Sequence, residues 1–155
     1  MASRNEVRWL TSDQQKAWRA YIMGTELLQH QLDRELREEH EISFSEYEIL
    51  VRLSEAEGGR MRMAILADAM SHSRSRVTHT IARMEKDNLV TRVGCPTDRR
   101  GVWATLTDTG ADMLRTAAPS HVATVRKLFV DAAGPDDYAA LGRAFEAVIK
   151  ATDPT

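Results

Sequence analysis

The stretch from Leu66 to Gly110 constrains the fold of this chain most, because two helical patterns and a hairpin pattern follow one another there without a linker. Within it, Ser73 is a good N-cap and predicts a helix that ends near Asp87. The apolar positions of this helix recur at helical spacing, at Val77, Ile81 and Met84. One side of the helix therefore packs inward, and the opposite side stays free.

The free side of this helix is small, polar and basic. At 100° per residue it is centred on Ser75, His79, Ala82 and Lys86. A helix with such a face, led by the positive end of its dipole, is suited to the major groove of DNA. We expect base choice from Ser75, Arg76, Thr78 and His79, and anchoring from Arg74, Arg83, Arg99 and Arg100. The candidate DNA-binding residues, with the N-cap included, are Ser73, Arg74, Ser75, Arg76, Thr78, His79, Arg83, Arg99 and Arg100.

Two further patterns complete a DNA-reading unit around this helix. The helical segment before it carries Leu66, Ala67 and Met70, which are placed to pack on the second helix across a three-residue turn, as in a helix-turn-helix. After it, Asn88 can take the left-handed cap conformation. We then expect a strand at 90–93, a loop at 94–101 and a returning strand at 102–106. The loop presents Arg99 and Arg100 to phosphates or to a narrow minor groove.

The motif Asp98-x-Arg100-x5-Leu106-Thr107-x2-Gly110, with the helices before it, resembles the winged helix-turn-helix of the MarR family of bacterial transcription regulators. The resemblance implies a homodimer that binds a pseudo-palindromic operator, with the helix from Ser73 in the major groove and Arg100 in the minor groove. It also implies that Asp98 is a salt-bridge partner that braces the wing. Two residues depart from the family pattern: His72 replaces a usually apolar residue, and His79 replaces a frequent arginine.

Charge is distributed unevenly along the 155 residues, although the net charge is only −2. Positions 60–101 hold nine basic and four acidic residues, a net charge of +5, and the remainder has a net charge of −7. This pattern predicts one module that faces phosphate, while the rest faces solvent or a partner protein. The length favours a single domain, 1–155.

The segments that flank the reading unit predict long amphipathic helices. Ser12-x-x-Gln15 fits a capping box at the first helix, with Thr11 as the other candidate cap, and Ser43-x-x-Glu46 fits a second one. We expect 60–62 to form a third small strand, and a kink or break at Pro119 in the helix that follows the wing. The chain then divides into a DNA-binding lobe at 43–106 and a helical dimerisation lobe formed by 11–40 and 107–152. The predicted fold class is mainly α with a small antiparallel β-hairpin wing.

No catalytic grouping is apparent in the sequence. The histidines lie at 30, 40, 72, 79 and 121 without metal-ligand spacing, so we expect them to be polar surface residues. We expect no enzyme activity, metal or cofactor. No signal peptide or long apolar run is present, which predicts a cytoplasmic protein with no membrane association. The single cysteine, Cys95, lies on the wing, where oxidation could move the adjacent arginines, although an incidental thiol is the simpler interpretation.

Aromatic residues suggest a ligand pocket between the first helix, the second helix and the helix after the wing. Its candidate lining is Trp18, Tyr21 and Tyr47, together with Trp9. The family resemblance implies small aromatic or phenolic anions as effectors, and ordinary core packing is the alternative for such residues. The sequence therefore favours a homodimeric transcriptional repressor released by a small molecule. The alternatives are a regulator that responds to oxidation of Cys95, and a winged-helix protein-interaction module without specific DNA binding.

Overall fold

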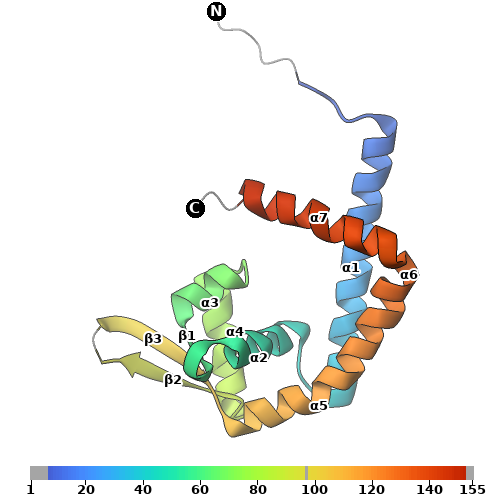
Figure 1. The fold of residues 1–155 in the computed structure, drawn as a ribbon. Helices are drawn as coiled ribbons and strands as arrows, with labels where there is room; N and C mark the ends of the chain where they lie inside the picture. Colours follow the sequence, from blue (N-terminus) through green and yellow to red (C-terminus); the bar gives the residue numbers. More distant parts are fainter. Residues whose placement is uncertain (1–6, 97, 153–155) are drawn as a thin grey trace, which may run out of the picture.

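The computed structural model describes residues 7–96 and 98–152, without the side chains of Arg99 and Arg100. Figure 1 shows mainly helices with a small sheet at one side, which confirms the predicted fold class. The helices are α1 (Ser12–His40), α2 (Phe44–Glu55), α3 (Met63–Ala69), α4 (Arg74–Lys86), α5 (Asp108–Val125), α6 (Asp131–Ala133) and α7 (Pro135–Thr152). A 3-10 turn, η1 (Glu57–Gly59), precedes the first strand, and a π-helical turn, η2 (Arg126–Val130), follows α5. The strands are β1 (Arg60–Arg62), β2 (Val90–Cys95) and β3 (Asp98–Leu106).

The helix-turn-helix is formed by α3 and α4, as the sequence predicts. Ser73 caps α4, because its hydroxyl accepts a hydrogen bond from the backbone N–H of Arg76 at 3.3 Å. Asn88 has φ 55° and ends the turn after α4 in the left-handed conformation. Val77, Ile81 and Met84 are buried, so the predicted inward face is confirmed.

The three strands form one antiparallel sheet in the order β1-β3-β2, which confirms the short third strand at 60–62. The predicted eight-residue wing loop is wrong, because β2 extends to Cys95 and β3 begins at Asp98. A register shift between Gly94 and Cys95 lets the pairing continue toward the tip. Gly101 allows the two strands to approach closely, since an added Cβ would lie 3.0 Å from the side chains of Cys95 and Asp98.

The hydrophobic core lies mainly in residues 43–106, the winged-helix lobe, and it also includes Leu36, Ile42 and Ala117. Its fully buried side chains come from α2, α3, α4 and β2, and they are Ile49, Leu50, Leu53, Leu66, Val77, Ile81, Met84 and Val90. The predicted capping box at the start of α2 is confirmed, because Ser43 and Glu46 bond to each other's backbone N–H groups. The core therefore fixes α4 against α2 and the sheet.

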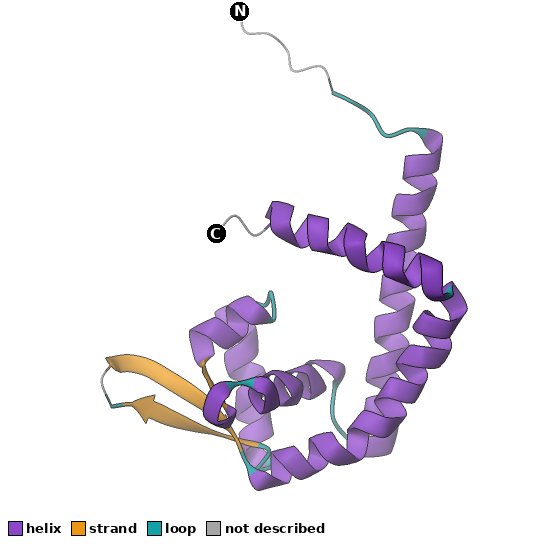
Figure 2. Cartoon of the chain, in the orientation of Figure 1, coloured by secondary structure: helices purple, strands orange, loops and turns teal. Residues whose placement is uncertain are grey.

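The helical lobe, residues 11–40 and 107–152, consists of α1, α5, η2, α6 and α7, which Figure 2 shows as a run of helices beside the winged-helix lobe. Among the residues of α1, only Leu32 and Leu36 are buried, and α7 buries none. Thr11 is the cap of α1 and Gln14 closes its capping box, so the predicted Ser12-x-x-Gln15 box is wrong by one residue. No helix in the described part of the chain is both long and apolar enough to cross a membrane.

Of the predicted kink or break at Pro119, the break is wrong, because α5 continues through this residue to Val125. Proline fixes φ near the helical value, so it costs one backbone hydrogen bond but does not by itself end the helix. Both α1 and α2 pack against α5 next to that position, where His40 contacts Ser120 and Tyr47 contacts His121. The irregular turn lies beyond it, at η2, and Gly134 with φ 80° then separates α6 from α7.

Candidate nucleic-acid interface

The outward face of α4 is the polar centre of the site. Each predicted DNA-binding residue of this helix and its cap is exposed: Ser73, Arg74, Ser75, Arg76, Thr78, His79 and Arg83. The hydroxyl of Thr78 donates to the carbonyl of Arg74 at 2.8 Å, which leaves its oxygen as an acceptor toward solvent. The face thus offers short polar groups in the middle and long cationic groups at the edges.

A groove separates α4 from the wing on one flank. This wing-side groove has a volume of about 350 Å³. Its lining is Arg62, Met63, Ala64, Arg74, Thr78, Arg92, Asp98, Gly101 and Val102. Arg92 is held by Glu85 of α4, with Nη2 and Oε2 2.7 Å apart, so this cation is fixed between the recognition helix and β2.

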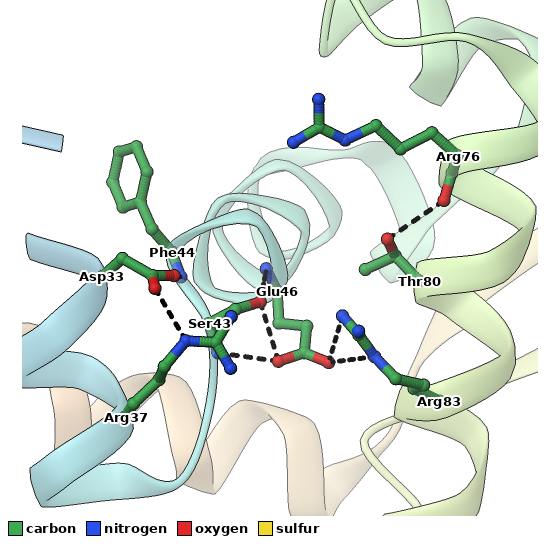
Figure 3. Close-up of polar contacts among 8 residues, drawn as sticks. All are labelled: Asp33, Arg37, Ser43, Phe44, Glu46, Arg76, Thr80 and Arg83. Atoms are coloured by element: carbon green, nitrogen blue, oxygen red, sulfur yellow. Dashed lines mark hydrogen bonds and ion pairs between the residues drawn. The ribbon is translucent and has the colours of Figure 1, made fainter. Parts of the chain in front are cut away.

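A second groove lies on the opposite flank of α4, toward the start of α2 and the end of α1. This α2-side groove has a volume of about 580 Å³, and its lining is Asp33, Arg37, Ser43, Ser45, Ser75, Arg76, His79, Thr80 and Arg83. Figure 3 shows the side chains of Arg76 and Arg83 extending from α4 on this flank. Arginines therefore line both sides of the recognition helix, where the two strands of a bound duplex would run.

Arg83 is engaged in this groove by a residue that the sequence analysis did not place in the site. Its Nη2 lies 3.2 Å from Oε1 of Glu46, a buried carboxylate on α2. The capping box identified Glu46 as a helix-start residue, but its contact with a residue 37 positions away depends on the packing of α2 against α4.

The wing is held to β1 by the ion pair that the family resemblance implied for Asp98. Its Oδ2 lies 3.2 Å from Nη1 of Arg62, whose Nη2 also donates to Sγ of Cys95 at 3.7 Å. The guanidinium groups of Arg60 and Arg62 lie 4.9 and 5.4 Å from the ring centroid of Trp103. These two arginines therefore cover an aromatic ring of the wing. Arg99 and Arg100 belong to β3, and their side chains lie outside the described atoms.

The structure places the residues of the predicted aromatic pocket in different surroundings. An apolar groove of about 650 Å³ lies between α1, the start of α2, η2 and α7. Its lining is Ala20, Tyr21, Gly24, Thr25, Leu28, Gln29, Leu32, Phe44, Leu128, Phe129, Tyr138, Leu141, Gly142 and Phe145. Tyr21 contributes to it, and Trp18 packs on Tyr21 with 5.7 Å between ring centroids. Tyr47 belongs instead to the hydrophobic core, and Trp9 is 82% exposed.

His121 contradicts the expected surface polarity of the histidines. The ring of His121 packs against Tyr47 with 4.3 Å between centroids, and its Nδ1 is buried without a partner in the part of the chain that is described. Burial lowers the pKa of this imidazole, although the charge of Glu35 opposes the shift. Burial and the charges of Arg76 and Arg52 also lower the pKa of His72. Among the described residues, no cluster of three or more acidic, histidine or cysteine side chains could hold a metal ion.

A helix-turn-helix with an exposed polar recognition helix, two flanking grooves and a β-hairpin wing defines a winged helix-turn-helix protein. A sequence model of the MarR family matches residues 42–102. The chain is 45% identical to AbsC, a MarR family transcriptional regulator from Streptomyces coelicolor, with TM-score 0.87 over 94% of this chain and 98% of that one. The chain therefore belongs to the MarR family of transcriptional regulators.

Two further structures support this assignment at different levels. Sco3205, a MarR family transcriptional regulator from Streptomyces coelicolor solved in complex with DNA, is 39% identical, with TM-score 0.93 over 98% of this chain and 95% of that one. CouR from Rhodococcus jostii RHA1, bound to p-coumaroyl-CoA, is 18% identical, with TM-score 0.74 over 95% and 98% of the chains, and shares the fold. Among curated proteins no sequence matches the chain.

Proposed function

We propose that the chain is a homodimeric, sequence-specific DNA-binding repressor that a small aromatic ligand releases from its operator. The observation that carries this proposal is the exposed polar face of α4 between two arginine-lined grooves. With α4 in the major groove, Ser75, Arg76, Thr78 and His79 face the base edges. Arg74 and Arg83 face phosphates along the two flanks, and Arg99 and Arg100 extend the contact at the wing. Because the proposed partner is operator DNA, the proposal includes a cytoplasmic location.

The helical lobe supports dimerisation, because its apolar side chains are left uncovered within one chain. Large exposed hydrophobic residues gather on α1, α5, η2 and α7, and they are Trp18, Tyr21, Ile22, Met23, Leu27, Val122, Leu128, Tyr138, Val148 and Ile149. A soluble monomer rarely exposes so many large apolar side chains on neighbouring helices. A second copy of the chain would cover them and place two recognition helices on one face of the duplex.

The apolar groove supports an effector site. Its lining includes five aromatic rings and the polar groups of Thr25 and Gln29, but no charged side chain. A neutral aromatic or phenolic compound therefore fits this lining better than the anion that the family resemblance implies. Such a ligand releases the operator only if it binds more tightly to a dimer whose recognition helices are wrongly spaced.

Selection of bound sequences from a random DNA pool tests the DNA-binding proposal. We expect enrichment of a pseudo-palindrome whose half-sites are about one helical turn, or ~34 Å, apart. A single unpaired half-site would contradict the dimer, and the lack of any consensus would contradict sequence-specific recognition. Deletion of the coding sequence should raise transcription from promoters that contain the selected sequence. A fall in transcription would show that the protein is an activator and not a repressor.

A variant that fills the apolar groove tests the effector proposal. An added Cβ at Gly142 would meet no heavy atom within 4 Å, so Gly142→Leu places new volume in open space along this groove. We expect the variant to bind operator like the wild type but to resist release by a panel of neutral phenols and aromatic esters. Release of the variant at wild-type concentrations of these compounds would place the effector elsewhere.

A further inference from the structure

The buried carboxylate of Glu46 joins two elements that are distant in sequence, the first turn of α2 and the recognition helix α4. Its Oε1 accepts hydrogen bonds from Nε of Arg83 at 3.3 Å and from Nη2 at 3.2 Å, as Figure 3 shows. The side chain of Glu46 is 9% exposed, whereas that of Arg83 is 50% exposed. The carboxylate therefore holds Arg83 from the inner side of the α2-side groove and leaves half of the arginine available to a phosphate.

The other oxygen of Glu46 fixes the carboxylate itself. Its Oε2 accepts from the backbone N–H of Ser43 at 2.7 Å and from the hydroxyl of Ser43 at 2.8 Å. The next backbone N–H, that of Phe44, donates to Oδ1 of Asp33 on α1 at 2.9 Å. The side chain that holds Arg83 is thus hydrogen-bonded within a turn that is itself attached to the helical lobe.

We propose that Glu46 is a positioning residue for operator binding, because it sets the conformation of Arg83 and the attachment of α4 to the start of α2. The inference rests on the proposed function, since Arg83 is a candidate phosphate contact. A long arginine side chain loses rotamer freedom when it binds a phosphate, and a carboxylate that restrains it beforehand reduces that loss. Glu46 itself does not contact DNA in this account, and its effect on affinity passes entirely through Arg83.

A double-mutant cycle on the full-length chain tests this inference with Glu46→Gln, Arg83→Gln and the double variant. Glutamine preserves the capping box but loses the charge that holds Arg83. The probe is the chain's own upstream DNA or the sequence selected above, and the measured quantity is the dissociation constant. We expect Glu46→Gln to raise it about fivefold and Arg83→Gln about tenfold, with the double variant no weaker than about tenfold, because coupled residues are not additive.

Controls separate positioning from a general structural role. Asp112→Asn makes the same carboxylate-to-amide change at the exposed ion pair between Asp112 and Arg115 on α5, outside both grooves, and should leave operator affinity unchanged. If effects of Glu46→Gln and Arg83→Gln multiply to about fiftyfold, the positioning role is overturned. Wild-type protein that binds no DNA would overturn the proposed function instead, and the inference with it.

A second variant keeps the inference testable if Glu46→Gln unfolds the chain. Arg83→Lys retains the positive charge and leaves the α2 capping box intact, but an ammonium cannot reproduce the two guanidinium contacts to Oε1. We expect Arg83→Lys to weaken operator binding almost as much as Arg83→Gln. Wild-type affinity in Arg83→Lys would show that charge alone matters at this position, and positioning by Glu46 would be wrong.

Discussion

The winged-helix lobe and the helical lobe bury their apolar side chains to very different extents. In the winged-helix lobe, α2, α3 and α4 converge on residues such as Leu50 and Ile81, neither of which is exposed at all. In the helical lobe, α7 has no buried residue, and α1 leaves Ile22 45% exposed. The comparison shows that most of the buried core lies in the winged-helix lobe, whereas the helical lobe leaves most of its apolar side chains exposed within one chain. We propose that a second copy of the chain covers them.

The largest expected effect comes from a charge placed on the uncovered face of α1. We expect Ile22→Asp to raise the dissociation constant of the dimer at least about a hundredfold, because it buries an unpaired carboxylate at the interface in each protomer. Sedimentation velocity over a range of concentrations measures this change.

The matched control for this variant lies in the other lobe. Ile65 on α3 is 53% exposed, similar to Ile22, so Ile65→Asp makes the same chemical change on a comparable surface. It should leave the oligomeric state unchanged. A wild-type chain that is monomeric at all concentrations, or equal dissociation of both variants, would contradict the assigned difference between the lobes.

The next largest effect is expected in the core of the winged-helix lobe. Leu50→Ala should lower the free energy of unfolding by about 2–5 kcal/mol, because a fully buried leucine is replaced by a cavity. Ile65→Ala, at the half-exposed position, should change it by less than about 0.5 kcal/mol. Urea unfolding at fixed protein concentration measures both values. Similar losses in the two variants would mean that the core is centred elsewhere.

A moderate effect is expected from one arginine of the α2-side groove. Arg76→Ala should weaken operator binding about tenfold and reduce the slope of log affinity against log salt by roughly one unit, because the DNA-facing surface loses one cation that displaces counterions in the groove. Titrations at several salt concentrations provide the slope. Arg115→Ala, which removes an exposed arginine of α5, is the control and should retain the wild-type slope. An unchanged slope in Arg76→Ala would remove this residue from the interface.

The smallest effect concerns His121, at the contact between α5 and α2. Its pKa is lowered by burial in the folded chain, so the unfolded chain binds the proton more readily. The free energy of unfolding should therefore fall as the pH drops below 6.5, the ordinary pKa of the ring. The titratable groups that face it are Glu35 on α1, whose charge opposes the shift, and Tyr47 on α2, whose pKa burial raises.

The variant His121→Phe keeps a ring between Phe44 and Tyr47 but cannot bind a proton. We expect it to flatten the pH dependence between about pH 7 and pH 5 by a few tenths of a kcal/mol per pH unit, well under the ~1.4 kcal/mol that one full proton allows, because water screens a half-buried ring. The pKa of His72 is also lowered, so we expect His72 to account for the pH dependence of unfolding that remains in this variant. Identical pH profiles for variant and wild type would exclude His121 as the source.

Local signals in the sequence were sufficient to predict the reading unit. The cap at Ser73, the spacing of Val77, Ile81 and Met84 and the left-handed Asn88 depend on neighbouring residues, and each is confirmed. The sequence pattern predicts too long a wing loop, because Gly101 is typical of a loop but here allows close strand pairing.

Contacts between distant elements could not be predicted in this way. The pairing of Glu46 with Arg83 and the burial of His121 against Tyr47 depend on how α2 packs on α4 and α5. The apolar groove includes Phe129 and Phe145, whose helical spacing indicated only an apolar face and not what it covers. The division of these aromatic residues between core and groove is a property of the tertiary arrangement.

The most direct test of the central claim is a fluorescence anisotropy titration of the full-length chain on its own upstream DNA, at two salt concentrations and with excess unrelated DNA present. A sequence-specific dimeric regulator should bind tightly despite the competitor, lose affinity steeply with salt and saturate at two chains per operator. Binding that the competitor abolishes, or no binding by a folded dimer, would contradict the claim that α4 and the wing form a specific DNA-reading surface.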